Sequence, residues 1–289
     1  MKKKFAIAGT MLLTALLCIG CGSAPDGQKS ETPEAGNQQL EYSNLVDSES
    51  QKEVKELLEK HGVTAEQTDT LMVWADDFNS RVTSQPLPEG FQKTDEKGVD
   101  YKGLIISNKE AEDGWIYPEA NCRLTSYLLM KNFISTNGKS ADDDTFLMFD
   151  AEAVDTYEPF KLSEEERSGF MSLFSWVPVK GAETIEAHAQ LIQKAWQDRE
   201  VKIGGDGISL ITVYLHSPLE EVRFVGHTGV LIEEGDGLMF VEKYGPQFPF
   251  QVTKFNDREQ LKQYLLGRGD LYGDETELAP IVMENDRLL

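Results

Sequence analysis

The sequence has 289 residues, of which 40% are hydrophobic and 9% aromatic, enough for one large domain or two small ones. Its formal net charge is −22, and about −25 without the three lysines of the first twenty residues. Because phosphate groups are bound by basic surfaces, this charge argues against nucleic acid or anionic lipid as a partner of the folded domain. It suits a soluble, secreted protein and says nothing about the fold.

Residues 1–20 are typical of a secretory signal peptide, with three lysines followed by an apolar run that is short for a transmembrane helix. The run ends in Gly20-Cys21, which resembles a bacterial lipobox, although Cys18 stands where leucine is commonest. The resemblance implies that the leader is removed and that Cys21 carries lipid. We therefore expect an extracytoplasmic protein anchored to the bacterial cell membrane. An ordinary signal peptide cleaved nearby is the alternative.

The composition then changes twice along the chain. Residues 21–45 are rich in Gly, Ser, Pro, Gln, Asn and Glu, and such a segment buries too little apolar surface to fold, which predicts a flexible tether. Residues 46–289 have the composition of a single domain. Helical spacing of apolar residues predicts helices over 48–61, 64–82, about 122–133, 163–176, 182–199 and 257–266.

Strand patterns dominate the last third of the domain. After residue 207 the pattern changes to period two and to short β-branched runs, which predicts strands over 208–215, 222–232, 238–244 and 250–255, with a hairpin loop at 233–237. A short strand is also predicted over 101–106. Helices followed by a meander of antiparallel strands indicate an α+β fold.

Cys122 is the only cysteine outside the first 21 residues, and it opens the predicted central helix. A helix N-terminus lowers the pKa of a thiol, and a single Cys with a distant His is a candidate nucleophile. The partner that we predict is His227, and the next strand places Glu242 near it, where a carboxylate would orient the imidazole. An inert buried Cys122, a strand-end His227 bonded to backbone, and a Glu242 paired with a basic residue are the alternatives. His216 is a less favoured base.

Four residues near the thiol complete the candidate site. The Asn121 side chain, with the Cys122 backbone N–H, is predicted to bind an oxyanion. Arg123 is predicted to depress the thiol pKa and to bind a substrate carboxylate. Trp115 and Tyr117 line a cleft in one interpretation and pack under the loop in the other. No nucleotide loop, zinc motif or serine nucleophile elbow appears in the sequence, so no cofactor and no metal are predicted.

The Cys at a helix start, the stretch His227-Thr228-Gly229-Val230 and a polar residue on the following strand resemble the papain-like fold of NlpC-type bacterial cell-wall peptidases. The resemblance implies Cys122 as nucleophile, His227 as base and Glu242 as the orienting residue. The sequence departs from that family at Asn121, Arg123 and Glu242, where Asp, a small or aromatic residue, and His, Asn or Gln are usual. The whole mature chain also resembles an uncharacterised family of bacterial lipoproteins, domain of unknown function 4300.

Two functional hypotheses follow from these patterns. The first is a lipid-anchored thiol hydrolase that cleaves an amide bond, with cell-wall peptide as the substrate class. The second is a non-catalytic surface binding or scaffold lipoprotein. The hydrolase needs an accessible Cys122 within hydrogen-bond reach of His227, whereas a binding protein could bury that thiol.

Overall fold

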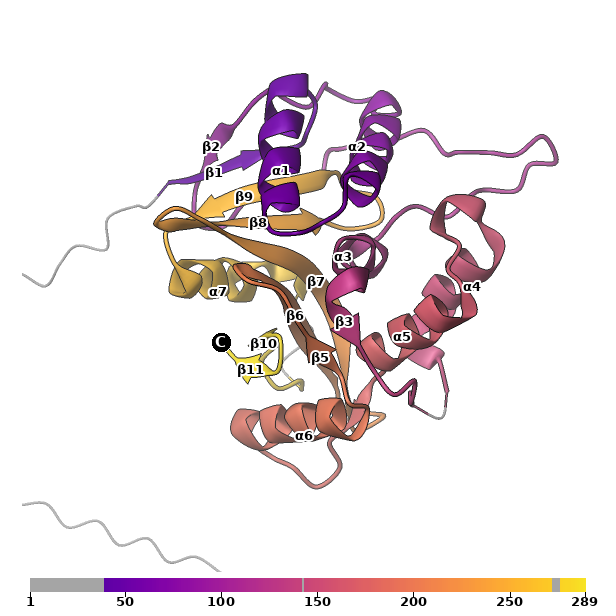
Figure 1. Ribbon diagram of the computed structural model, residues 1–289, viewed down its shortest axis with the longest axis vertical. Coiled ribbons are helices and arrows are strands. Elements are labelled where there is room, and N and C mark those ends of the chain that lie inside the picture. The colour runs from indigo at the N-terminus through magenta and orange to yellow at the C-terminus, as the bar shows by residue number, and fades with distance from the viewer. Residues whose placement is uncertain (1–38, 142, 272–275) are drawn as a thin grey trace, which may run out of the picture. The chain divides into compact units, whose positions relative to one another are not determined.

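The computed structural model describes residues 39–141, 143–271 and 276–289 (Figure 1). The predicted signal peptide, Cys21 and most of the predicted tether lie outside the described residues. Within the described part, none of the helices has the length and apolar character that a membrane span requires. The secondary structure is mixed, with seven α-helices, four short 3-10 helices and eleven strands among these residues.

One antiparallel sheet organises the described chain. Its strands run in the order β11-β10-β6-β7-β8-β9-β1-β2, and β4 also pairs with β7. The central strands form the predicted meander, and β1 crosses from the N-terminal side to pair with β9. The bounds are β1 Leu40–Ser43, β2 Gln92–Thr94, β4 Val177–Pro178, β6 Ile208–Ser217, β7 Val222–Glu234, β8 Gly237–Lys243, β9 Phe250–Phe255, β10 Ile281–Glu284 and β11 Arg287–Leu288. A separate pair joins β3 Ile134–Ser135 to β5 Lys202–Ile203.

The helices begin where the sequence offers a capping side chain. Thr64 and Ser163 each close a capping box, with Gln67 and Glu166 respectively, and so satisfy N–H groups that a helix start leaves free. The bounds are α1 Ser48–Lys60, α2 Ala65–Ser80, α3 Cys122–Met130, α4 Met148–Thr156, α5 Glu164–Phe174, α6 Ile185–Asp198 and α7 Arg258–Gly267. The 3-10 helices are Lys131–Phe133, Thr145–Leu147, Glu158–Phe160 and Gly269–Leu271.

Helices cover both faces of the sheet (Figure 1). Alternate residues of a strand point to opposite faces, so Val230 and Val241 join the larger core with α1, α2 and α3, while Leu231 and Phe240 join a smaller core with α7. The central strands are therefore buried on both sides. This explains why their sequences are almost continuously hydrophobic instead of alternating with polar residues.

Three parts of the chain differ from the sequence-based expectation. The segment 101–106 forms no strand, because Tyr101 turns inward to bond Asn44 and Gln251, and only an isolated bridge joins Ile106 to Val82. The tether prediction extended too far, since β1 lies inside it and Leu40 and Leu45 are buried. The unpredicted elements include α4, and β10, which pairs with β6.

Candidate active site

The central helix α3 begins at Cys122, as predicted. Asn121 adopts an extended conformation, and its side-chain oxygen accepts a hydrogen bond from the Leu124 N–H at 2.9 Å, which fixes the start of the helix. Cys122 is therefore the first residue of the helix, where the helix dipole favours a thiolate. Its residue exposure is only 7%, so the thiol is almost enclosed.

His227 lies on β7 beside an irregularity in the strand. Val213 of β6 faces His227 and the next residue faces Val225, so Gly226 is an extra residue in β7. Across the hairpin, Glu242 stands opposite Gly229 and is therefore a diagonal neighbour of His227. The His227 Nε2 atom lies 2.6 Å from Glu242 Oε2, and both side chains are buried. The sequence-based prediction that the hairpin brings these two side chains together is confirmed.

Two residues hold Glu242 from α7 and the segment after it. The Arg268 Nη1 atom donates to Glu242 Oε2 at 2.6 Å, and the Tyr264 hydroxyl donates to Oε1 at 3.0 Å. Arg268 is in turn fixed by the Tyr244 carbonyl and the Asp270 carboxylate. Both interpretations of Glu242 therefore describe contacts that are present, since it bonds the imidazole and pairs with a basic residue.

The polar cluster continues away from the imidazole through buried side chains. Gln251 donates to the Tyr264 hydroxyl at 2.9 Å and accepts from the Tyr101 hydroxyl at 2.7 Å, and Asn44 donates to Tyr101 at 2.7 Å. Every one of these groups is buried. Because each of these side chains has at least one hydrogen-bond partner, the network fixes the position of Glu242 from three separate segments of the chain.

The ionisation of the thiol and the imidazole is coupled. Burial alone would raise the pKa of Cys122, but the hydrogen bond with His227 and the charge of Arg123 outweigh it and lower that pKa. Burial and the Arg268 charge act to lower the pKa of His227, yet its contacts with Cys122 and Glu242 leave it raised. A lowered thiol pKa and a raised imidazole pKa together favour the thiolate–imidazolium form of the pair.

The residues on either side of the thiol are tied to α4. The Asn121 amide donates to Asp150 Oδ1 at 2.8 Å, and Arg123 Nη2 donates to Asp150 Oδ2 at 2.7 Å. Arg123 also donates to the Val225 carbonyl on β7. These contacts give Asn121 and Arg123 structural partners, and their predicted roles at an oxyanion and a substrate carboxylate stay predictions.

Trp115 and Tyr117 form an aromatic row with a third ring. The ring centroids of Trp115 and Tyr117 are 4.9 Å apart, and those of Tyr117 and Tyr157 are 4.8 Å apart. Trp115 is 40% exposed, whereas Tyr117 is partly buried against the larger core. Packing under the loop therefore describes Tyr117 better than Trp115. Their predicted contact with a substrate remains a prediction.

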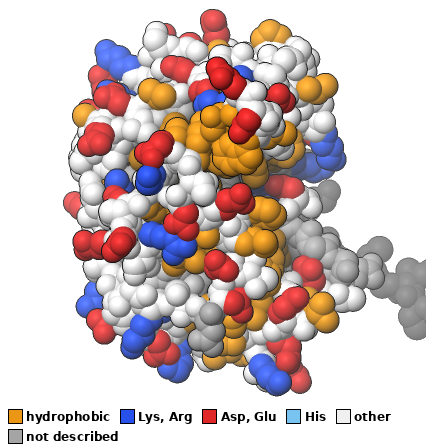
Figure 2. Space-filling model, turned by 90° about the vertical axis from the view of Figure 1, so that its right-hand side faces the viewer, with side chains coloured by type: hydrophobic (Ala, Val, Ile, Leu, Met, Phe, Trp, Pro, Cys, Tyr) orange, Lys and Arg blue, Asp and Glu red, His pale blue; other side chains and the backbone are white. Residues whose placement is uncertain are grey.

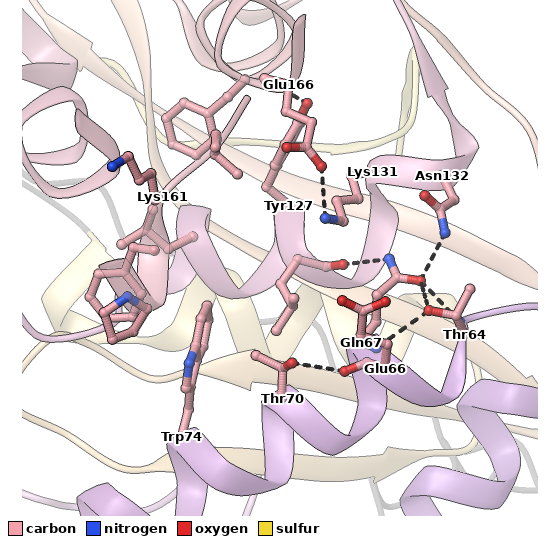
Figure 3. Close-up of a pocket in the computed structure, with 16 residues that line it drawn as sticks. Thr64, Glu66, Gln67, Thr70, Trp74, Tyr127, Lys131, Asn132, Lys161 and Glu166 are labelled. Carbon is pink, nitrogen blue, oxygen red and sulfur yellow. Dashed lines mark hydrogen bonds and ion pairs between the residues drawn. The ribbon is translucent and has the colours of Figure 1, made fainter. Parts of the chain in front are cut away.

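A groove runs along the flank of α3, the helix that Cys122 opens (Figure 3). Its volume is about 370 Å³, within the size range of small-molecule sites. Figure 3 shows the Lys131–Glu166 ion pair and Gln67 on one side and Trp74 on another. The lining residues of α3 are Leu124, Tyr127 and Leu128.

The structure adds three residues that the sequence did not reveal. Asp150, Tyr264 and Arg268 contact the candidate site from α4, from α7 and from the residue after α7. Of the three, only Tyr264 lies within an element that the sequence predicted, the helix over 257–266. The other histidines have structural contacts: His188 accepts from Arg223, and His216 accepts from the Leu278 N–H. In the described ranges, no group of three or more His, Cys, Asp or Glu side chains is arranged to hold a metal ion.

Taken together, these contacts define an α+β protein with an enclosed Cys–His–Glu cluster between a helix start and an antiparallel sheet. Residues 41–289 match the family described as Domain of unknown function (DUF4300), and the chain belongs to this family. No curated protein and no solved structure matches the chain.

Proposed function

We propose that the protein is a lipid-anchored extracytoplasmic thiol hydrolase that cleaves an amide bond, with cell-wall peptide as the substrate class. One observation carries the proposal: His227 Nε2 lies 2.6 Å from the buried carboxylate of Glu242, on the strand that packs against the Cys122 helix. The thiol and the imidazole are also close enough for each to shift the pKa of the other. The order of these residues, on a helix start and two successive strands, is also the reason for proposing a papain-like core.

The chemistry follows from the three side chains. The Cys122 thiolate attacks the amide carbonyl and forms a carbon–sulfur bond, and the His227 imidazolium gives its proton to the leaving amine as the carbon–nitrogen bond breaks. Water then attacks the thioester with His227 as base, which releases the acid and restores the thiol. The Cys122 backbone N–H at the helix start would stabilise the oxyanion.

Glu242 orients the imidazole and stabilises its cation. Arg268 opposes the stabilisation of the imidazolium, because its positive charge lowers the pKa of His227. The Arg268 charge therefore makes the imidazolium more acidic than Glu242 alone would leave it. The groove along α3 is lined by none of these three side chains, so it is not part of the proposed site.

A second candidate function is a binding or scaffold lipoprotein without catalysis. The observation that favours it is the burial of Cys122, which leaves the residue only 7% exposed. A thiol that substrate does not reach acts only as part of the core.

Alkylation of the purified full-length protein with iodoacetamide across pH separates the two. The hydrolase predicts fast reaction at Cys122 with an apparent pKa below that of a free thiol, and a rate at neutral pH at least tenfold slower in His227→Ala. His216→Ala is the matched control and leaves the rate unchanged. Equally slow alkylation of all three proteins would reject the hydrolase. Release of amines from purified cell-wall peptide, abolished in Cys122→Ser, then tests the substrate class.

A further inference from the structure

A second cavity lies where α2 meets β8 and β9, on the face of the sheet that α1, α2 and α3 cover. Its volume is about 130 Å³. Trp74, Pro159 and Phe160 line both this cavity and the groove of Figure 3, so the two adjoin. The walls are mainly aromatic, as small-molecule sites usually are, with rings from Trp74, Phe78, Tyr157, Phe160 and Phe250.

The unusual wall of this cavity is Lys243, whose side chain has no exposure. Its ammonium lies 3.7 Å from the centroid of the Phe78 ring and 4.9 Å from that of Phe250. It donates to the carbonyls of Phe248 and Pro246. Among the described residues, no carboxylate forms an ion pair with it and no acceptor is present for its third N–H group. A buried charge without a counterion is costly, so the charged form of Lys243 requires a further partner.

The two carboxylates near the cavity are already neutralised. Glu119 pairs with Arg81 through both oxygens at 2.7 Å. Asp77 pairs with Arg81 at 3.0 Å and with Lys109 at 2.8 Å. These four side chains carry two positive and two negative charges, so a protonated Lys243 adds one positive charge that nothing in the cavity balances. The net charge of the whole chain is −22, so this positive surplus is local. It would favour an anion in the cavity.

We propose that this cavity binds a small organic carboxylate with an aromatic or short aliphatic body, and that the carboxylate pairs with Lys243. The aromatic rings would enclose the body, and the free N–H of the ammonium would reach a carboxylate oxygen. The cavity of about 130 Å³ is slightly smaller than one of roughly 150 Å³ that accommodates benzene, so the body of such a ligand would extend into the adjoining groove. The site goes beyond the proposed hydrolase and does not depend on any reaction at Cys122.

Proton uptake is a consequence of this assignment. Burial lowers the pKa of Lys243 well below its usual value, which favours the neutral amine in the empty cavity. A bound carboxylate favours the ammonium. Binding therefore takes up as much as one proton, whereas binding of an uncharged analogue takes up none.

The test is calorimetry of the full-length protein with benzoate and with its neutral analogue benzamide. The expected result is that benzoate binds at least tenfold more tightly than benzamide, and that Lys243→Met abolishes this preference. Lys254→Met is the matched control, because Lys254 also lies over an aromatic ring, that of Phe91, but lines neither the cavity nor the groove. It should keep the preference for benzoate. Hexanoate and hexanamide, titrated in the same way, extend the test to an aliphatic body.

A purely structural lysine, which only secures the turn after β8, predicts a different outcome. Neither carboxylate would then bind more tightly than its amide, and that result overturns the proposal. Should Lys243→Met fail to fold, the wild-type protein still decides, because titrations in two buffers of different ionisation enthalpy count the protons taken up. Uptake with benzoate supports the site, and its absence rejects it.

Discussion

Arg268 and Glu242 form an ion pair that water does not reach, with Nη1 2.6 Å from Oε2 and neither side chain exposed. The same carboxylate oxygen contacts His227. A single buried oxygen is thus shared by a permanent cation and by an imidazole that titrates. The stability of the protein and the acidity of His227 are therefore linked through Glu242.

Replacing Arg268 should show both effects. Arg268→Met leaves a buried carboxylate without its cation, which costs roughly 3–5 kcal/mol of unfolding free energy. It also removes a charge that lowers the pKa of His227, so that pKa should rise. Urea unfolding and NMR titration of the imidazole measure the two changes.

Arg258→Met is the control for this substitution. Arg258 is also paired, with Glu233 and Glu284, but its side chain is 43% exposed, so its loss should cost about 1 kcal/mol or less. Equal costs for the two variants would contradict the importance that we assign to the buried pair.

Asp47 should make the stability of the protein depend on pH in acid. Partial burial would raise its pKa, but hydrogen bonds from Ser50, Gly90 and Glu49 lower it to about 2 from an ordinary value of 3.8. Because the folded-state pKa is the lower one, its contribution is fully present above the unfolded value and disappears as the pH falls from about 4 to 2. Asp47→Ala should cost about 1 kcal/mol at neutral pH, the usual value of an N-cap, and much less at pH 2.

The control for this prediction keeps the cap but removes the charge. Asp47→Asn keeps an oxygen for the Glu49 and Ser50 N–H groups but loses the acceptor of the Gly90 N–H, so it should retain only part of the neutral-pH stability. The contribution of this position should then no longer depend on pH. Unfolding free energies at several pH values compare the three proteins. If the loss of unfolding free energy on Asp47→Ala is the same at pH 4 and at pH 2, the assignment is contradicted.

Gly229, in the stretch that resembles cell-wall peptidases, should tolerate no side chain. A Cβ at this position would overlap the Phe240 ring and approach the Val241 carbonyl within 2.8 Å. Gly229→Ala is therefore expected to destabilise the protein by about 1–3 kcal/mol. Gly103→Ala, where no atom lies within 4 Å of the added carbon, should change stability by less than about 0.5 kcal/mol in the same thermal unfolding experiment.

The lipid anchor is a prediction from the sequence alone. Cells that express the protein and are fed labelled palmitate should incorporate label into the wild-type chain and into Cys18→Ala, but not into Cys21→Ala. The unlabelled variant should also leave the membrane fraction, because the lipid chains supply the membrane affinity. Labelling of all three proteins would place the lipid at another residue.

The sequence predicted most of the helices and the central strands, because their signals are local. Thr64, Ser163 and Asp257 each cap the helix that follows, and the hairpin between β7 and β8 fixed Glu242 near His227. The false strand at 101–106 shows the limit of such patterns. Tyr101 is buried by side-chain bonds to residues distant in sequence, which a local pattern does not report.

By itself, then, the sequence determined the α+β class, the helix start at Cys122 and the facing of His227 and Glu242, since each depends on periodicity, capping or hairpin register. Only the tertiary structure decided which groups surround that cluster. Arg268 and Asp150 contact the cluster from other segments of the chain, after α7 and on α4. Lys243 is buried against Phe78 of α2. Burial and long-range pairing set the ionisation of these groups, and neither is encoded in a short stretch of residues.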